Sequence, residues 1–135
     1  MTSEEARSRL AALGLDEGAL EVLLAHFEEA ERRGKVGHGL SRVAWLETLD
    51  FDPAARPTRV VADEGFERWQ GNGALGYLVL DEITRSLIAS PPLRARVVVA
   101  EHCFPTGVLG AWARRLAEAV AASRAGTIRK PLTVL

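Results

Sequence analysis

The chain has 135 residues, of which 47% are apolar and 26% are charged, and its formal net charge at neutral pH is −1. These values are typical of an ordinary globular protein, and we expect residues 1–135 to form a single domain. The near-zero charge offers no electrostatic basis for binding nucleic acid or a membrane surface, so neither is expected as a partner.

A single cysteine excludes an internal disulfide and, with only three histidines, argues against a zinc site, so no metal is expected. The N-terminus is polar and acidic, without the pattern of a secretory leader. No apolar run approaches the length of a membrane span. We therefore expect a cytoplasmic protein.

The first third of the chain predicts two helices. Thr2-Ser3-Glu4-Glu5 has the form of a capping box, with Thr2 as the N-cap of a helix that stops at Gly14. Asp16 is the expected N-cap of a second helix, which ends at Gly34. Its apolar residues recur at helical spacing: Leu20, Leu23, Leu24, Phe27 and Ala30. His26 on this helix is interpreted as a packing or surface histidine.

The stretch Gly37-His38-Gly39-Leu40-Ser41-Arg42 is the first candidate site. His38 and Arg42 are four residues apart, a spacing that can place both side chains on one side of a helical turn. There Arg42 could hold a small carboxylate as a bidentate donor, with His38 as its hydrogen-bond or proton partner. The structural alternative is a salt bridge for Arg42 and a helix-start role for His38. A helical pattern continues to about Asp50.

The second half alternates strands and helices. Residues 58–62 and 66–70 predict a hairpin, and a glycine-rich loop, 71–76, opens a helix that ends before Pro91. Residues 95–100 predict the strongest strand, in which three consecutive valines indicate burial on both faces. A long helix from Gly107 to about Arg124 and a possible edge strand, 127–135, follow. This order predicts an α/β fold (α+β mixed): a helical N-terminal arm followed by a small mixed sheet with packed helices.

Two further features invite a chemical interpretation. The loop 71–76 has a G-x-G-x-x-G pattern, but the acidic candidate for ribose binding, Glu101, lies too far along the chain, so a dinucleotide site is not inferred. His102-Cys103 follows the strongest strand, where an imidazole and a thiol could serve as acid, base or nucleophile. Neighbouring side chains at a strand end usually point apart, so a direct His102–Cys103 pair is not expected. The alternative is a buried thiol beside a loop histidine.

Five segments follow one another in the order found in a known family. Residues 28–34 and 37–42 match a helix leading into a Ser-His-Gly-x-Ser-Arg motif, and residues 53–57 match a proline-bounded connector. Residues 71–76 match a Gly-Asp-Asn-Gly-Leu-Gly loop, and residues 107–113 match the helix start after an Asn-Ser-x-His-Phe-Gly motif. Together they span nearly the whole chain, which resembles the non-Rossmann malate/L-lactate dehydrogenase family, including ureidoglycolate dehydrogenase and Δ1-piperideine-2-carboxylate reductase.

The resemblance implies that His38 and Arg42 keep the family's histidine and substrate-binding arginine, with Ser41 also binding substrate. It implies departures as well, because Pro105 falls where the family has its catalytic histidine, and His102 and Cys103 fall on its Asn-Ser pair. Family members are more than twice as long, so we expect most of the cofactor domain to be missing. No cofactor is therefore expected for this chain.

Three hypotheses on function follow. The first is a repurposed, cofactor-independent enzyme that performs tautomerisation, hydration, elimination or cyclisation on a small 2-oxo acid or cyclic imino acid. In it, His38, His102 and Cys103 are the candidate catalytic residues, and Arg42 and Ser41 bind the carboxylate. The second is a non-catalytic module that binds a ligand or a partner protein, or forms a homodimer. The third is one half of a split NAD(P)-dependent dehydrogenase.

Overall fold

The computed structural model describes residues 1–125 of the chain. In chain order its elements are α1 (Ser3–Ala12), α2 (Glu17–Arg32), a short 3-10 helix η1 (Val36–His38), α3 (Arg42–Leu46), β1 (Thr58–Ala62), β2 (Phe66–Gln70), α4 (Gly76–Ala89), β3 (Val97–Glu101) and α5 (Leu109–Ala125). The expected α/β class, with N-terminal helices and a small mixed sheet, is confirmed. The predicted strand 127–135 lies outside the described residues.

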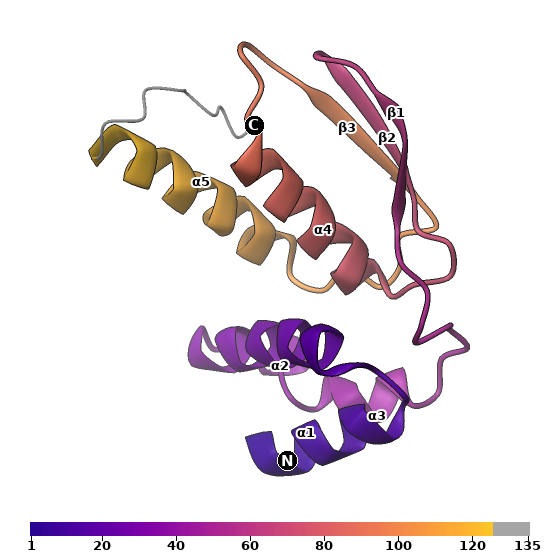
Figure 1. The fold of residues 1–135 in the computed structure, drawn as a ribbon. Coiled ribbons are helices and arrows are strands. Elements are labelled where there is room, and N and C mark those ends of the chain that lie inside the picture. The colour runs from indigo at the N-terminus through magenta and orange to yellow at the C-terminus, as the bar shows by residue number, and fades with distance from the viewer. Residues whose placement is uncertain (126–135) are drawn as a thin grey trace.

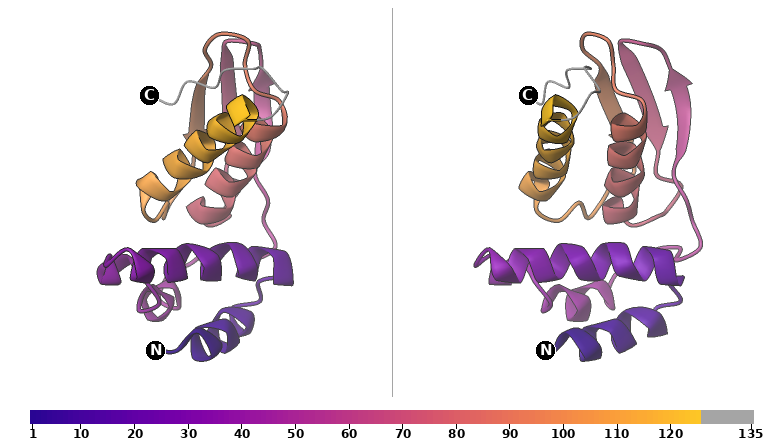
Figure 2. Two further views of the ribbon diagram at one scale, coloured as in Figure 1. Left: turned by 90° about the vertical axis from the view of Figure 1, so that its left-hand side faces the viewer. Right: turned by 60° about the vertical axis from the view of Figure 1, so that its left-hand side comes forward.

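The elements form two groups (Figure 1). Helices α1, α2 and α3 lie together at one end, and α4, α5 and the sheet lie at the other. Further views show α4 between the sheet and α5, with the near ends of α4 and α5 facing α2 (Figure 2). Among the helices in the described range, none has an apolar stretch of the length that crossing a bilayer would need.

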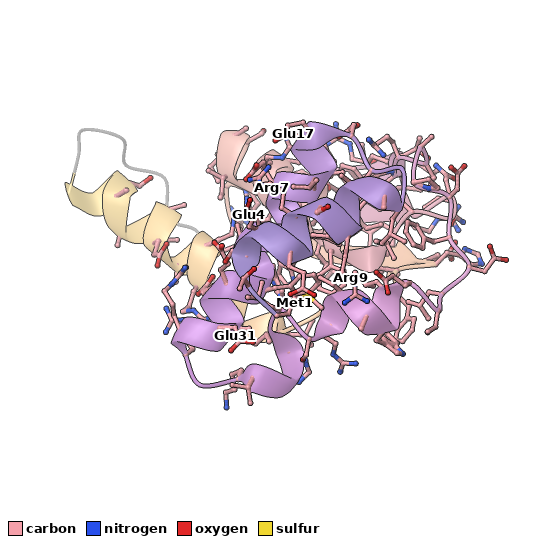
Figure 3. All side chains as sticks on the ribbon, turned by 90° about the horizontal axis from the view of Figure 1, so that it is seen from below. Met1, Glu4, Arg7, Arg9, Glu17 and Glu31 are labelled. Atoms are coloured by element: carbon pink, nitrogen blue, oxygen red, sulfur yellow. The ribbon has the colours of Figure 1, made fainter. Side chains whose placement is uncertain are left out.

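Local signals in the sequence place the N-terminal helices as expected. The Thr2 hydroxyl accepts a hydrogen bond from the Glu5 amide (3.1 Å), and the Asp16 carboxylate accepts one from Ala19 (2.8 Å). Gly34, with φ of 71°, ends α2 in the left-handed conformation that glycine adopts without strain. Arg7 of α1 pairs with Glu17 of α2 at 2.9 Å on the underside of the molecule (Figure 3).

One hydrophobic core joins the two groups of elements. Side chains from α1, α2 and α3 meet residues of the loop before α4 and of α4 and α5 themselves, and the best buried of them include Leu10, Leu23, Phe27, Val43, Leu46, Leu75 and Tyr77. Because α2 contributes to this core along most of its length, it separates α1 and α3 from α4 and α5.

The sheet has the order β1-β2-β3, with an antiparallel β1–β2 hairpin and a parallel β2–β3 pair. Helix α4 covers one face through a cluster that includes Trp69, Val79 and Ile83. On the other face Val97 and Val99 are 62% and 40% exposed. The prediction that β3 is buried on both faces is therefore wrong, because β3 is an edge strand of the described sheet with a helix on one face only.

A buried carboxylate ties the hairpin to the start of β3. Glu67 is 2% exposed and accepts hydrogen bonds from Trp69 Nε1 (2.9 Å), Arg96 (3.1 Å) and Arg59 (3.2 Å). Three donors compensate its loss of hydration, so the charge can remain inside.

The glycine-rich loop is a place where two backbone segments cross. A Cβ atom on Gly76 would lie 2.6 Å from the carbonyl oxygen of Pro105 and 2.8 Å from the carbonyl carbon of Cys103. A Cβ atom on Gly71 would overlap the carbonyl oxygen of His102. The backbone of residues 102–105 passes close to the start of α4, and this close approach explains why both positions are glycine.

This crossing can be tested with Gly76→Ala. The added methyl group meets backbone atoms that cannot turn away, so the free energy of unfolding should fall by about 1–3 kcal/mol. Gly65→Ala is the matched control, because a Cβ atom there meets nothing within 4 Å. Urea unfolding of the two variants measures the difference, and an equal loss of stability in both would contradict the crossing as the reason for Gly76.

Candidate carboxylate site

The Gly37–Arg42 stretch does not form one helical turn. η1 ends at His38, Gly39 is extended (φ −90°, ψ −151°), and α3 begins at Arg42. The predicted turn shared by His38 and Arg42 is therefore wrong. The reason is the Glu31 carboxylate, which accepts the Leu40 amide (3.1 Å) and leaves no room for a Cβ atom at Gly39.

Arg42 is the central charged residue of the stretch. It is half-buried, and its guanidinium carbon lies 4.7 Å from the ring centroid of Trp45. Through residue 123, the arginines without an acidic group within ion-pair distance are Arg32, Arg42 and Arg94. Arg32 and Arg94 are exposed, so Arg42 is the half-buried guanidinium in this range without a carboxylate.

The loop after β3 reaches this arginine. The Phe104 ring meets the Trp45 ring edge to face at 5.9 Å, although Phe104 itself is 71% exposed. Burial raises the pKa of the Tyr77 hydroxyl, and the positive charge of Arg42 acts on that pKa in the opposite direction. Arg42 therefore lies among aromatic side chains from α3, α4 and the loop at residues 102–108.

His26 holds that loop in place. It is 6% exposed, its Nε2 accepts the Val108 amide (3.0 Å), and its ring stacks on Trp112 at 5.0 Å. A Cβ atom on Gly107 would overlap both His26 and Tyr77, so the loop passes directly over the two rings. The interpretation of His26 as a packing residue is confirmed. Its partner is 82 residues away, a contact that no local pattern could reveal.

The surroundings keep His26 neutral. Burial lowers the pKa of His26 from 6.5 to about 4, against the opposing effect of Glu29, and nearby His38 adds to the lowering of this pKa. Since Nε2 accepts a hydrogen bond from the Val108 amide, the ring proton is on Nδ1.

His102 is oriented by the end of β2. Its φ is 51°, and its Nδ1 lies 2.7 Å from Gln70 Oε1. The same oxygen accepts the Asn72 amide (3.5 Å), while Gln70 Nε2 donates to Glu101 (3.4 Å), which sets the orientation of the amide group. The neutral His102 ring therefore donates from Nδ1, and its exposed Nε2 is the unprotonated nitrogen.

The side chain of Cys103 points toward α4 and away from Gln70, the partner of His102. Its half-buried thiol lies 3.8 Å from the carbonyl oxygen of Gly76, and burial raises the pKa of this thiol. The expectation that His102 and Cys103 point apart is confirmed. A thiol with a raised pKa is little ionised at neutral pH, so it is poorly prepared to act as a nucleophile.

The structure brings some of the predicted residues together and not others. Arg42 and the loop at residues 102–108 meet through Trp45 and Phe104. Ser41 donates its hydroxyl proton to the carbonyl oxygen of Val36 (3.2 Å). Within residues 1–123, no hydrogen bond or ring contact joins His102 or Cys103 to His38 or Arg42.

The glycine-rich loop does not fit a dinucleotide phosphate. The amides of Gly71, Asn72 and Ala74 donate to Glu101, Gln70 and Gly71 respectively, so they are not available to a ligand. The backbone of residues 102–105 covers the start of α4, where a phosphate would bind. In the part of the chain that the structure describes, no three of His, Cys, Asp and Glu are placed to hold a metal ion.

No protein-family model and no curated protein matches the sequence. Solved structures do share the fold. The malate dehydrogenase of Entamoeba histolytica has a TM-score of 0.77 over 87% of this chain, and the sulfolactate dehydrogenase of Methanocaldococcus jannaschii has 0.73 over 83%. The malate dehydrogenase of Pyrococcus horikoshii has 0.72 over 86%. Each is 18% identical to this chain, which covers 34%, 34% and 35% of their lengths in the same order.

These similarities show the fold alone. The chain corresponds to about a third of each dehydrogenase, and its α/β architecture is that of the matched part. The resemblance read from the sequence motifs is thus supported at the level of the fold. What those enzymes bind and catalyse enters below only as a proposal.

The role of His26 predicts a pH dependence of stability. Because the folded-state pKa of about 4 lies below the ordinary value of 6.5, the unfolded chain binds the proton first as the pH falls. The contribution of neutral His26 to the free energy of unfolding is therefore complete above pH 6.5, and it is lost progressively between pH 6.5 and 4. From pH 7 to pH 5 the free energy of unfolding should fall by about 2 kcal/mol.

His26→Phe should remove this dependence while lowering stability at pH 7, since the Val108 amide loses its acceptor. Urea unfolding at a series of pH values measures both effects. His102→Ala, which removes an exposed histidine, should keep the pH profile of the natural protein. A His26→Phe profile as steep as that of the natural protein would show that another group carries the dependence.

Proposed function

We propose that this chain binds a small 2-oxo acid or cyclic imino acid at Arg42 and acts on it by acid/base chemistry, without a cofactor. The observation that supports the proposal is a half-buried guanidinium with no carboxylate partner in the described part of the chain, lying over Trp45. A charge that gives up part of its hydration gains most from a ligand that replaces the lost water.

The surroundings of Arg42 suit a planar carboxylate. The guanidinium carbon lies over the Trp45 ring, and no acidic group of the described range pairs with its N–H groups, which are therefore open to bidentate donation to a carboxylate. Trp45 and Phe104 supply an apolar wall on which a flat 2-oxo or imino group can lie. The site would thus select small, flat and anionic ligands.

His38 is the proton-transfer group in this proposal. It is exposed at the end of η1, and a neutral imidazole there can accept a proton from the carbon next to the oxo or imino group. The electron pair of the broken C–H bond moves into the C–C bond, and the oxo or imino group accepts a proton to give the enol or enamine. The carboxylate stays on Arg42, the proton on the oxo or imino group comes from water, and His38 returns its own proton to water, which completes the tautomerisation. The reverse step places a solvent proton on the carbon.

His102 and Cys103 have weaker support as catalytic residues. The free Nε2 of His102 suits a general acid or base, yet its ring is held by Gln70 at the end of β2. The thiol of Cys103 points to Gly76, and its raised pKa disfavours the thiolate. We retain His102 as a second proton carrier and propose no nucleophilic step at Cys103.

A non-catalytic binding module is the second candidate. Two of the three predicted catalytic residues, His102 and Cys103, contact Gln70 and Gly76 and make no hydrogen bond to Arg42, so the carboxylate could bind without turnover. A homodimer or a partner protein would fit this function. One half of a split dehydrogenase is a third candidate, since the chain spans about a third of the matched enzymes.

Binding is tested first. Pyruvate and Δ1-piperideine-2-carboxylate are titrated into the protein, and the NMR shifts of the tryptophan indole groups are recorded. The shift of Trp45 should change and then saturate. Arg42→Gln should weaken this binding about tenfold or more, because the bidentate contact and the charge are both lost. Arg94→Gln is the control, since Arg94 is an exposed arginine that also lacks an acidic partner in the described range. An equal effect of both substitutions would reject a specific site at Arg42.

Turnover is tested separately. In deuterated water, the protein should catalyse exchange of the protons next to the oxo group of pyruvate, and His38→Ala should reduce the rate about a hundredfold. Binding at Arg42 without any exchange would reject the enzyme and favour the binding module. Exchange that survives His38→Ala but not His102→Ala would move the role of base to His102.

A further inference from the structure

A second candidate binding site lies between α2 and α5, next to His26. Two adjoining hollows of about 310 and 290 Å³ lie between α2 and α5, the larger one also reaching α4. They share Glu29, Ala111 and Arg115, so they form one groove. Figure 2 shows the start of α5 facing α2, the two helices that supply most of the lining residues.

The larger hollow is mainly apolar. It is lined by Val22 and Ala25 of α2 and by Ala111 and Trp112 of α5, with the ring of His26 beside them. The carboxylates at its border are already paired. Glu29 accepts from Arg33 and Arg114, each at 2.9 Å, and Asp81 is paired with Arg85 (2.9 Å) and Arg115 (2.7 Å).

The smaller hollow carries an excess of arginine. Its walls include Arg32, Arg33, Arg114 and Arg115 but only Glu29 and Glu118 as acids. Arg32 has no acidic partner within residues 1–123. Arg33, Arg114 and Arg115 are already paired with Glu29 and Asp81, so within residues 1–123 Arg32 carries the uncompensated positive charge at this end of the groove, and apolar surface lies at the other end.

We propose that this groove binds an amphiphilic anion. The apolar body of the ligand lies on Val22, Ala25 and Trp112, and its anionic head lies among the arginines of the smaller hollow. Each hollow is at the lower end of the size of small-molecule pockets, which fits a ligand of one or two rings or a short acyl chain. A carboxylate, sulfonate or phosphate head could each pair with the Arg32 guanidinium.

This site is distinct from the one at Arg42. The side chains that line it come from α2, α4 and α5, whereas Arg42, Trp45 and Phe104 lie on α3 and the loop at residues 102–108. His26 lines the larger hollow and also holds Val108, so it stands between the two. The inference does not rest on the function proposed for Arg42.

Anilinonaphthalene sulfonate, an aromatic anion with the required shape, is a suitable probe. Its fluorescence should show one saturable site on the intact chain. Ala25→Phe fills the apolar hollow from an exposed helix position and should weaken binding about tenfold or more. Arg32→Gln removes part of the charge and should weaken binding about threefold. Ala11→Phe, an exposed alanine of α1 on the far side of α2, should change nothing.

The uncharged phenylnaphthylamine tests the role of the anionic head. It should bind several-fold more weakly than the sulfonate, and raising the salt concentration should weaken only the sulfonate. Equal binding of the two probes, or a loss in Ala11→Phe as large as in Ala25→Phe, would overturn the proposal. Unchanged binding in Ala25→Phe would do the same, and circular dichroism of each variant confirms that it is folded.

Discussion

The hydrogen bond from the Val108 amide to the buried ring of His26 is the contact on which the candidate site depends. It joins α2 to the start of α5 and holds the loop at residues 102–108 over Tyr77. The same loop places Phe104 on Trp45 beside Arg42. Because burial keeps His26 neutral, Nε2 is free to accept this hydrogen bond. Protonation of the ring would remove the acceptor for the Val108 amide and would leave a positive charge buried away from water.

The fold places a partly desolvated positive charge among aromatic rings and leaves it without an acid in the described range. Most other arginines of the chain have carboxylate partners, including those at Glu67 and Asp81 in the interior. Arg32 and Arg94 also lack an acidic partner within residues 1–123, but both are exposed, so Arg42 is the half-buried guanidinium without one in that range. Solved structures of dehydrogenases share the fold of the chain, while the covered glycine-rich loop gives no phosphate cradle. The half-buried guanidinium without an acidic partner is the observation behind our proposal of a carboxylate ligand.

Local patterns predicted the helices and strands well where the cause was local. The caps at Thr2 and Asp16, the stop at Gly34 and the hairpin all depend on residues close in sequence. The prediction that β3 is buried on both faces was wrong. Three consecutive valines indicate an apolar strand, but they do not indicate which face of the sheet a helix covers. The shared turn of His38 and Arg42 was wrong because Glu31, several residues earlier, sets the conformation at Gly39. Arg42 was a candidate from its sequence motif, but the aromatic side chains around it were not predicted.

The sequence by itself determined the order and type of the elements, the candidate arginine and the resemblance to a dehydrogenase family, because each is encoded in neighbouring residues. Only the tertiary structure decided what surrounds Arg42, where His102 and Cys103 point, and why Gly71 and Gly76 are glycines. All of these depend on contacts between distant segments, such as the 82-residue separation of His26 and Val108. Packing brings such groups together through the burial of shared apolar surface, which no short window of sequence records.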